Sequence, residues 1–369
     1  MISQQDKILI MAGGTGGHIF PGLAVAEELE SRGWQAIWLG SKGGMEEELV
    51  AKSNIELNLI SVSGLRGKGV IGWLKAPYSL SKAVIEAIKV LKKIKPKVVV
   101  GFGGFASGPG GVAAFLTGTP LVIHEQNAVA GMTNRILSRL AKKVFQAFPG
   151  AFIRADKVET VGNPIRQSIV ELRNKKETPV IEPKKLINVL VVGGSRGALA
   201  LNRLLPNLFK NLFEQELIGI RHQVGKGRKE ESEKFYLAEN IQPGERLEIK
   251  EFIDDMAEAM DWADVVICRA GASTVSEIAA AGLCAVFVPF PYAVDDHQTA
   301  NANWLVAEQA AICIQERDLS TDETKAKLTE LISSPEQIAA MAKKAKQVAY
   351  LTAATKVADF CEDLRMKAA

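Results

Sequence analysis

Short apolar runs alternate with segments of helical periodicity along most of the chain. The first run, residues 7–12, leads into a glycine turn at 13–17 and then into a helical pattern that ends at Arg32. Continuously apolar runs of this kind are typical of strands that are buried on both faces of a parallel sheet. The pattern therefore predicts an α/β fold with doubly wound parallel sheets covered by helices. We expect further strands at residues 34–40, 55–62, 98–100, 121–123, 143–146, 188–192, 218–224, 247–250, 265–268 and 285–288.

The alternation pauses once, and the pause divides the chain. Residues 162–164 read Gly-Asn-Pro, and the polar stretch at 173–185 has few apolar residues to pack. A domain typically contains about 100–200 residues, so a chain of 369 residues favours two domains. We predict one domain at residues 1–166 and a second at 167–349. The tail from Ser334 has few helix breakers and predicts two consecutive helices.

Three glycine clusters follow predicted strands, at residues 13–17, 101–106 and 193–197. Glycine lets the backbone approach a ligand closely, and the N-terminus of the following helix attracts phosphate. The Lys-Ser or Lys-Thr of a P-loop is missing, and the Gly-x-Gly-x-x-Ala at 101–106 follows a late strand rather than the first. Each cluster alone also fits a tight turn without a ligand. Together, at one edge of each sheet, they favour a ligand that carries phosphate.

Polar residues follow several of the predicted strands. His18 comes after the first glycine turn, where a neutral imidazole can act as a general base. The alternative is a helix-start residue that bonds to the backbone. His124-Glu125-Gln126-Asn127 follows the run at 121–123, and Asp295-Asp296-His297-Gln298 follows residues 289–292. The second cluster contains metal-ligand types, but one short cluster is too little to predict a metal site.

A fourth turn, at residues 269–277, contains less glycine. It follows the run at 265–268 and begins the next helical pattern. Thr274 and Glu277 are three residues apart, which fits a capping box. The functional alternative is that Glu277 accepts hydrogen bonds from the hydroxyls of a ribose.

Composition narrows the class of protein without indicating a reaction. The apolar share of 47% and the charged share of 24% are ordinary for a soluble globular protein. The four cysteines lack a Cys-x-x-Cys spacing, which argues against a zinc site and a disulfide framework. No apolar run reaches the ~18 residues typical of a membrane span, and the N-terminus lacks the layout of a signal peptide. The net charge is only +3, but nine basic residues fall between Gly64 and Lys97, where Glu86 is the only acid.

The motifs, in this order, resemble those of the MurG family of bacterial peptidoglycan N-acetylglucosaminyltransferases. The resemblance runs from about residue 7 to residue 304 and includes 13–18, 103–109, 124–127, 162–166, 193–198 and 269–277, with Gln298 and Asn301. It implies a GT-B fold, in which two Rossmann-like domains face a cleft and a last helix, at about 350–369, returns to the first domain. The implied reaction transfers N-acetylglucosamine, with inversion, from UDP-N-acetylglucosamine (UDP-GlcNAc) to the 4-hydroxyl of the N-acetylmuramyl unit of lipid I. The product is lipid II, a precursor of peptidoglycan.

The resemblance also implies roles for particular residues. The C-terminal domain would hold the donor: Ser195 at the diphosphate, the main chain of Ile253 at the uracil, Glu277 at the ribose and Gln298 at the sugar. The helix start beneath the phosphates would comprise Ala272, Ser273, Thr274, Val275 and Ser276. The N-terminal domain would complete the cleft with Thr15, Gly16, Gly17, Asn127 and Arg166.

The chemistry expected of this site needs a base but no metal. Backbone donors and a helix N-terminus can offset the charge that develops on the departing UDP, so we expect neither a metal nor a cofactor. The acceptor hydroxyl is a poor nucleophile, and His18 is the first candidate for its base. Glu125 is the second, because a carboxylate in a closed cleft can have a raised pKa.

A lipid-linked acceptor gives the basic segment a function. We expect peripheral binding at the cytoplasmic face of the membrane, with apolar Ile71, Trp73 and Leu74 at the lipid interface and Lys68 and Lys75 at anionic headgroups. The alternative is a solvated helix face with buried Ile and Leu. No nucleic-acid partner is expected.

Three other functions remain open from the sequence. One is another sugar-nucleotide enzyme of GT-B type, such as a UDP-GlcNAc epimerase, which would need catalytic carboxylates around the anomeric centre. A second is an NAD(P)-binding protein that uses residues 101–106. A third is a non-enzymatic module that retains the nucleotide cleft.

Overall fold

The computed structural model describes residues 5–62, 69–152, 156–175, 186–194 and 197–367, and side chains are described for all of these except 69–75 and 175. The chain forms two compact units. Unit 1 comprises residues 1–166 together with 350–369, and unit 2 comprises residues 167–349. Among the described residues, no helix is both long enough and apolar enough to cross a membrane.

Unit 1 is built on a sheet of seven parallel strands in the order β3-β2-β1-β4-β5-β6-β7. The strands are β1 (Lys7–Ala12), β2 (Gln35–Ser41), β3 (Glu56–Ile60), β4 (Val98–Gly103), β5 (Leu121–Glu125), β6 (Lys143–Gln146) and β7 (Val158–Thr160). Its helices are α1 (Gly16–Ser31), α2 (Glu46–Leu49), α3 (Gly69–Ile94), α4 (Ser107–Leu116), α5 (Met132–Leu137) and α14 (Ala353–Lys367). The predicted parallel α/β sheet is confirmed.

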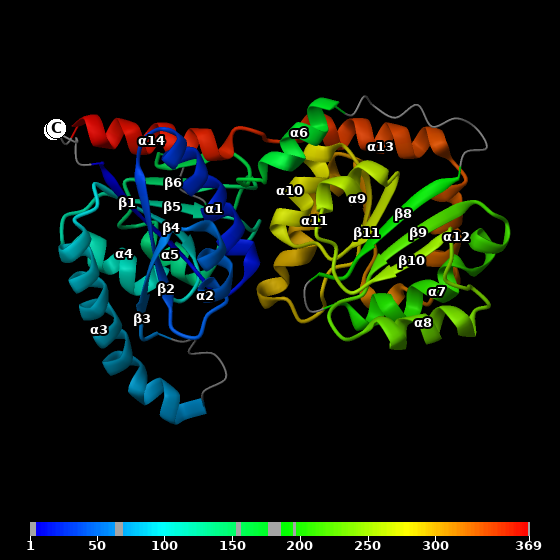
Figure 1. The fold of residues 1–369 in the computed structure, drawn as a ribbon, viewed down its shortest axis with the longest axis horizontal. Helices are drawn as coiled ribbons and strands as arrows, with labels where there is room; N and C mark the ends of the chain where they lie inside the picture. The colour runs from blue at the N-terminus through cyan, green and yellow to red at the C-terminus, as the bar shows by residue number, and fades with distance from the viewer. Residues whose placement is uncertain (1–4, 63–68, 153–155, 176–185, 195–196, 368–369) are drawn as a thin grey trace. The chain divides into compact units, whose positions relative to one another are not determined.

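Helices cover both faces of this sheet, and β1 shows why. Ile8 and Ile10 point to the face covered by α1 and α14, which lie side by side (Figure 1). Leu9 and Met11 point to the opposite face, against α3 and α4. Because both faces are covered, every residue of Ile8–Ala12 is buried. This double burial explains the continuously apolar run in the sequence.

Unit 2 has a sheet of six parallel strands in the order β10-β9-β8-β11-β12-β13. These are β8 (Ile187–Val192), β9 (Ile218–Gln223), β10 (Leu247–Lys250), β11 (Val265–Cys268), β12 (Cys284–Phe287) and β13 (Ala311–Cys313). The helices are α6 (Gln167–Lys175), α7 (Leu199–Glu214), α8 (Lys229–Ala238), α9 (Met256–Trp262), α10 (Ala272–Ala281), α11 (His297–Ala307), α12 (Asp322–Ile332) and α13 (Pro335–Val348). Short 3₁₀ helices are η1 (Val50–Ser53) in unit 1, and η2 (Val294–Asp296) and η3 (Glu316–Asp318) in unit 2.

In each sheet the strand order reverses at one place, between β1 and β4 in unit 1 and between β8 and β11 in unit 2. Ligands of doubly wound folds bind at the carboxyl ends of the strands at such a switch point. The glycine clusters at 13–17 and 103–104 follow β1 and β4, and the turns at 193–197 and 269–271 follow β8 and β11. The sheet topology therefore brings the predicted phosphate-binding turns to the switch points.

Several elements differ from the prediction. His124 and Glu125 are the last residues of β5 instead of following it, because His124 is fully buried and bonds to Gly162. The strands β7 and β13 contain three residues each and are too short to give a pattern. The two C-terminal helices are confirmed as α13 and α14, and Ser334 is the N-cap of α13, although its side chain makes no capping bond.

Candidate active site

The two glycine turns of unit 1 pack backbone against backbone. Gly104 has a φ of +86°, and a Cβ at this position would lie 2.2 Å from the carbonyl oxygen of Gly13. Any side chain at Gly104 would therefore force the turns apart. Glycine is required here both for the positive φ and for the close approach.

His18 lies across the joint between these turns. It is in the first turn of α1, and its Nδ1 is 3.1 Å from the hydroxyl oxygen of Thr15, the N-cap residue. The opposite side of the ring faces β4, because a Cβ on Gly103 would lie 3.2 Å from Nε2. Thr15 thus orients the ring, and the absence of a side chain at Gly103 makes space for it. His18 is also a helix-start residue that bonds to the backbone, because its N–H donates to the carbonyl of Thr15 at 3.1 Å.

Glu125 organises the loop that follows β5. Its side chain is buried, and each carboxylate oxygen accepts two hydrogen bonds. Oε1 accepts from the backbone and side-chain nitrogens of Asn127 at 3.0 and 3.3 Å. Oε2 accepts from the backbone of Gly131 at 3.1 Å and from Asn134 Nδ2 at 2.9 Å. The carboxylate therefore fixes the position of Asn127, a predicted substrate-binding residue.

His124 is buried below this loop and stays neutral. Gln126 donates to its Nδ1 at 3.1 Å, so Nε2 carries the proton and donates to the carbonyl of Gly162 at 2.9 Å. Burial lowers the pKa of His124 from 6.5 to about 4. Since both nitrogens are occupied inside the core, His124 is a structural residue.

Glu46 holds the first glycine turn and was missed by the sequence analysis. Its carboxylate is completely buried, and Oε1 accepts from the backbone and hydroxyl of Ser41 at 2.7 and 2.6 Å. Oε2 accepts from the backbone of Gly14 at 3.3 Å. A Cβ on Gly44 or on Gly13 would come within 2.3 or 2.5 Å of these oxygens. The glycines thus leave room for a buried charge directly behind the turn.

Unit 2 holds its first glycine turn with a neutral amide. Gln223, at the end of β9, accepts from the backbone of Gly194 at 2.9 Å and donates to the carbonyl of Gly194 at 3.0 Å. It also donates to the carbonyl of Glu251 at 2.9 Å. No local pattern in the sequence marks Gln223 as a support of this turn. Ser195, the predicted diphosphate ligand in this turn, lies outside the described residues.

The start of α10 presents an unpaired hydroxyl. Gly271 is the N-cap of this helix, and Ala272, Ser273 and Thr274 form its first turn. The Oγ of Ser273 is buried and has no hydrogen-bond partner in the described part of the chain. Backbone N–H groups in the first turn of a helix also lack intrahelical partners. This helix N-terminus, at the switch point, therefore offers several donors to a ligand.

Glu277 is one helical turn beyond Ser273 and on the same face of α10. Glu277 is buried, with 8% of its surface exposed. Because Gly271 rather than Thr274 caps the helix, the capping-box interpretation of Thr274 and Glu277 is wrong. Val275 and Ser276 are buried in the same helix.

The remaining predicted residues lie at helix starts and on loops of their own units. Gln298 Oε1 accepts from the backbone of Phe290 at 2.9 Å, which ties the start of α11 to the loop that follows β12. Ile253 lines a cavity of about 480 Å³ together with Phe252 and Lys250. Gly16 and Gly17 begin α1, and Arg166 precedes α6. In the ranges that the structure describes, no three His, Cys, Asp or Glu side chains form a metal-binding group.

Comparison with known proteins identifies the family. The glycosyltransferase family 28 N-terminal domain matches residues 8–146, and the family 28 C-terminal domain matches residues 188–360. A UDP-N-acetylglucosamine–N-acetylmuramyl-(pentapeptide) pyrophosphoryl-undecaprenol N-acetylglucosamine transferase from Cellvibrio japonicus is 48% identical over 360 residues, 97% of this chain and 98% of its own. The enzyme of the same name from Aeromonas hydrophila is 49% identical over 97% of this chain and 96% of its own. The chain belongs to this transferase family.

Solved structures agree with this assignment and with the GT-B fold. The crystal structure of Acinetobacter baumannii MurG has 42% sequence identity to this transferase and a TM-score of 0.81, and covers 97% of this chain and 99% of its own. A UDP-GlcNAc 2-epimerase from Neisseria meningitidis has a TM-score of 0.66 over 98% of this chain and all of its own, but only 15% identity. The likeness to the epimerase therefore shows a shared fold only.

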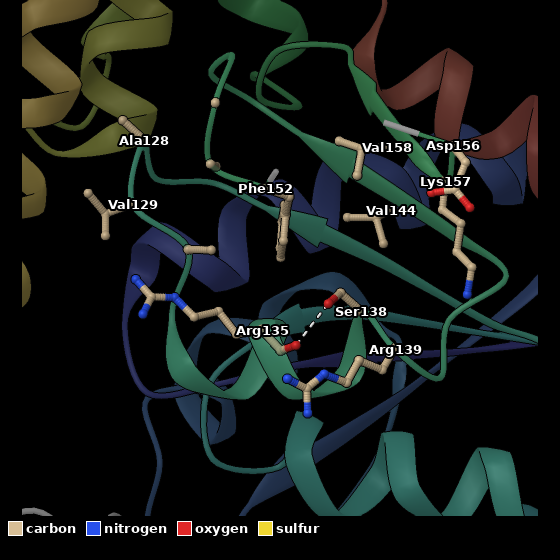
Figure 2. Close-up of a pocket in the computed structure, with 13 residues that line it drawn as sticks. Ala128, Val129, Arg135, Ser138, Arg139, Val144, Phe152, Asp156, Lys157 and Val158 are labelled. Carbon is tan, nitrogen blue, oxygen red and sulfur yellow. Dashed lines mark hydrogen bonds between the residues drawn. The ribbon is translucent and has the colours of Figure 1, made fainter. Parts of the chain in front are cut away.

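A second cavity of this transferase lies in unit 1, directly after the loop residue Asn127. It has a volume of about 600 Å³ and is lined by Ala128–Ala130, by Arg135 of α5 with Ser138 and Arg139 just after that helix, by Val144 of β6, and by residues 150–152 and 156–158, which lead into β7 (Figure 2). None of the residues predicted from the sequence lines it. Of the predicted membrane residues, Lys68 lies outside the described residues, and the side chains of Ile71, Trp73, Leu74 and Lys75 are not described although their backbone belongs to α3.

Proposed function

We propose that this transferase moves N-acetylglucosamine from UDP-GlcNAc to the 4-hydroxyl of the N-acetylmuramyl unit of lipid I, with inversion at the anomeric carbon. This is the step that forms lipid II in peptidoglycan synthesis. Besides the family membership, one observation supports the proposal most strongly. The hydroxyl of Ser273, buried and without a hydrogen-bond partner among the described residues, stands at the N-terminus of α10, at the switch point of unit 2. A donor diphosphate offers acceptors to this hydroxyl and to the N–H groups of the helix N-terminus.

In this proposal unit 2 binds the donor. Ser195 and the first turn of α10 hold the diphosphate, and Glu277 accepts hydrogen bonds from the ribose hydroxyls. Gln298 binds the sugar, and the main chain of Ile253 reads the uracil edge beside the cavity of about 480 Å³. Donors that are already oriented can stabilise the charge on departing UDP without a metal ion.

Unit 1 supplies the base and the acceptor contacts. His18 removes the proton from the 4-hydroxyl as that oxygen attacks the anomeric carbon and UDP leaves from the opposite side. The Thr15 hydroxyl at Nδ1 supports this role, because it orients the ring. Glu125 is the less suitable base, since its four accepted hydrogen bonds would have to break. We assign Glu125 to the positioning of Asn127. Gly16, Gly17 and Arg166 contribute to the binding of substrates.

Membrane docking is part of the same proposal. Ile71, Trp73 and Leu74 would enter the interface of an anionic cytoplasmic membrane surface, with Lys68 and Lys75 at its headgroups. Exposed apolar side chains continue along α3 at Tyr78, Leu80 and Ile85, and α4 adds Phe115 and Leu116. Trp73→Ser combined with Lys75→Glu should reduce binding to vesicles that contain anionic lipid. Unchanged vesicle binding would exclude this docking surface.

A transfer assay tests the reaction. Radiolabelled UDP-GlcNAc and a lipid I analogue should give a labelled disaccharide lipid and free UDP, with equal rates in the presence and absence of a chelator. UDP release without acceptor, or conversion of the donor to its epimer, would favour the epimerase alternative. Binding of the donor without turnover would favour the non-enzymatic module.

A further inference from the structure

The cavity of about 600 Å³ in unit 1 has an apolar floor and a cationic rim. Phe152, Val144 and Val158 supply apolar surface. Figure 2 shows Arg135 on α5, Arg139 just after that helix and Lys157 on a different wall, with Phe152 near the centre. The volume falls within the range of about 300–1,000 Å³ that is usual for sites of small ligands. It exceeds what a single phosphate group would fill.

The two arginines of this cavity differ from seven of the twelve arginines that the structure describes, which pair with carboxylates. Arg32, Arg221 and Arg269 each pair with a carboxylate. Arg135 and Arg139 form no ion pair with another described residue, and both are exposed. A guanidinium group offers a planar pair of donors that matches a carboxylate. Two unpaired guanidinium groups beside an apolar cavity therefore indicate a site for an organic acid.

The rim also carries one acid. Asp156 is exposed next to Lys157, whose Nζ is 3.4 Å from the carbonyl oxygen of Ala141. Any anion in the cavity, whether a lipid phosphate or a peptide carboxylate, would meet repulsion from Asp156 unless the same ligand also offers a donor or a positive charge to that acid. A peptide, which carries carboxylates as well as N–H donors and can carry an ammonium group, can satisfy both signs of charge. The mixed rim thus favours a peptide over a headgroup.

The cavity and the proposed catalytic residues share one loop. Ala128, Val129 and Ala130 line the cavity, and they directly follow Asn127, which Glu125 holds. Asn134 of α5 donates to Glu125, and the next residue, Arg135, lines the cavity. A group bound in the cavity would therefore lie against the loop that positions Asn127.

We propose that this cavity binds the peptide of the acceptor, with its carboxylates on Arg135 and Arg139. The inference rests on the proposed function, because the relatives in this family are named for an N-acetylmuramyl-(pentapeptide) substrate. The site makes peptide recognition a function of unit 1, separate from the transfer chemistry at His18.

The test compares two acceptors on a short, detergent-soluble lipid, one with the pentapeptide and one without a peptide. Arg135→Gln combined with Arg139→Gln should raise KM for the pentapeptide acceptor by about tenfold or more, the effect expected for the loss of charged hydrogen bonds. Neither kcat nor the KM of the peptide-free acceptor should change. Arg203→Gln, which removes an exposed arginine of α7, is the matched control and should affect neither acceptor.

Each other outcome has a distinct meaning. Equal losses on both acceptors, or no loss on either, would overturn the peptide site. A variant that loses affinity for anionic vesicles but keeps its KM for the pentapeptide acceptor would show a headgroup site instead. If the wild-type protein transfers to neither acceptor, the proposed function itself fails, whatever the cavity binds.

Discussion

The first glycine turn of each unit is held by a side chain that accepts a hydrogen bond from its backbone, but the two side chains differ in charge. In unit 1 the backbone N–H of Gly14 is bonded to Glu46, a completely buried carboxylate. In unit 2 the backbone N–H of Gly194 is bonded to Gln223, a neutral amide. Both supporting side chains lie far from their turn in the sequence: Glu46 is the first residue of helix α2, and Gln223 is the last residue of strand β9. The two units therefore have a similar sheet topology, but the side chain behind the first glycine turn is negatively charged in unit 1 and neutral in unit 2.

This difference fits a division of labour between the units. A buried negative charge behind a turn disfavours a second anion on that turn, whereas an amide does not. The turn of unit 2 is thus the better place for the donor diphosphate. The N–H of Gly14 is bonded to Glu46 and that of Gly194 to Gln223, so in both units a phosphate would bind to other donors, such as the N–H groups of the helix that follows.

The largest effect is expected from His18→Ala, which removes the proposed base from unit 1. We expect kcat to fall by about 10²–10⁴-fold, the usual contribution of a general base. Donor affinity should stay near the wild-type value, because unit 2 is intact. Steady-state kinetics combined with donor titration by calorimetry measures both quantities. Near-normal turnover would remove His18 as the base.

Glu277→Ala should act on donor binding instead. Loss of charged hydrogen bonds to the ribose should weaken UDP-GlcNAc by about 10–100-fold, since such bonds contribute about 1.5–3 kcal/mol. Glu245→Ala removes an exposed carboxylate from the same unit and should leave the affinity unchanged. A Glu277→Ala variant with normal donor affinity would contradict the ribose assignment.

Exchanging the charges of the two turns tests the comparison directly. Gln223→Glu places a carboxylate behind the donor turn and should raise the donor KM by about tenfold. Glu46→Gln keeps the shape in unit 1 and should leave the donor KM unchanged while lowering kcat. Thermal unfolding of both variants controls for damage to the fold. Equal shifts of donor KM would show that the two turns are not electrostatically specialised.

The smallest effect concerns stability and involves one buried histidine in each unit. Burial lowers the pKa of His124 to about 4 and that of His222 to about 3, from an ordinary value of 6.5. The unfolded chain therefore takes up protons first as the pH falls below 6.5, and the free energy of unfolding decreases. Between pH 7 and pH 5 we expect each histidine to lower it by about 2 kcal/mol.

Denaturant unfolding at the two pH values measures this loss. His222→Gln keeps a polar group for the hydroxyl of Tyr236, which bonds to His222 at 2.9 Å, but it cannot titrate. Its loss of stability between pH 7 and pH 5 should be smaller than that of the wild-type protein by about 2 kcal/mol. An identical pH dependence would show that His222 does not contribute.

The strands were predictable where the apolar run was complete. The runs at 7–12 and 265–268 have the bounds that the structure gives to β1 and β11. The bounds of β6 and β10 also agree with the prediction, although their sequences, KVFQ and LEIK, are only partly apolar. A strand that is buried on both faces of a parallel sheet needs a continuously apolar sequence, so such a run predicts the position of the strand. Neither β7 nor β13 was predictable in this way, because each is a three-residue strand at the edge of its sheet.

The supports of the candidate site were not predictable. Glu46 and Gln223 resemble ordinary polar residues in the sequence, and they act on glycines 32 and 29 residues away. Glu277 showed the opposite problem, because its spacing from Thr274 suggested a cap that the structure assigns to Gly271. The spacing of residues in the sequence suggests only bonds between near neighbours. The partner of a buried polar group depends instead on how distant elements pack.

The sequence by itself determined the class of fold, the positions of the glycine turns and, through its ordered motifs, the family. These properties follow from local rules, since strand burial, positive φ and helix starts each depend on a few adjacent residues. Only the tertiary structure decided which side chains support the turns, where the ring of His18 is directed and which arginines remain unpaired beside a cavity. These depend on contacts between segments that are distant in the chain, which only the folded sheet brings together.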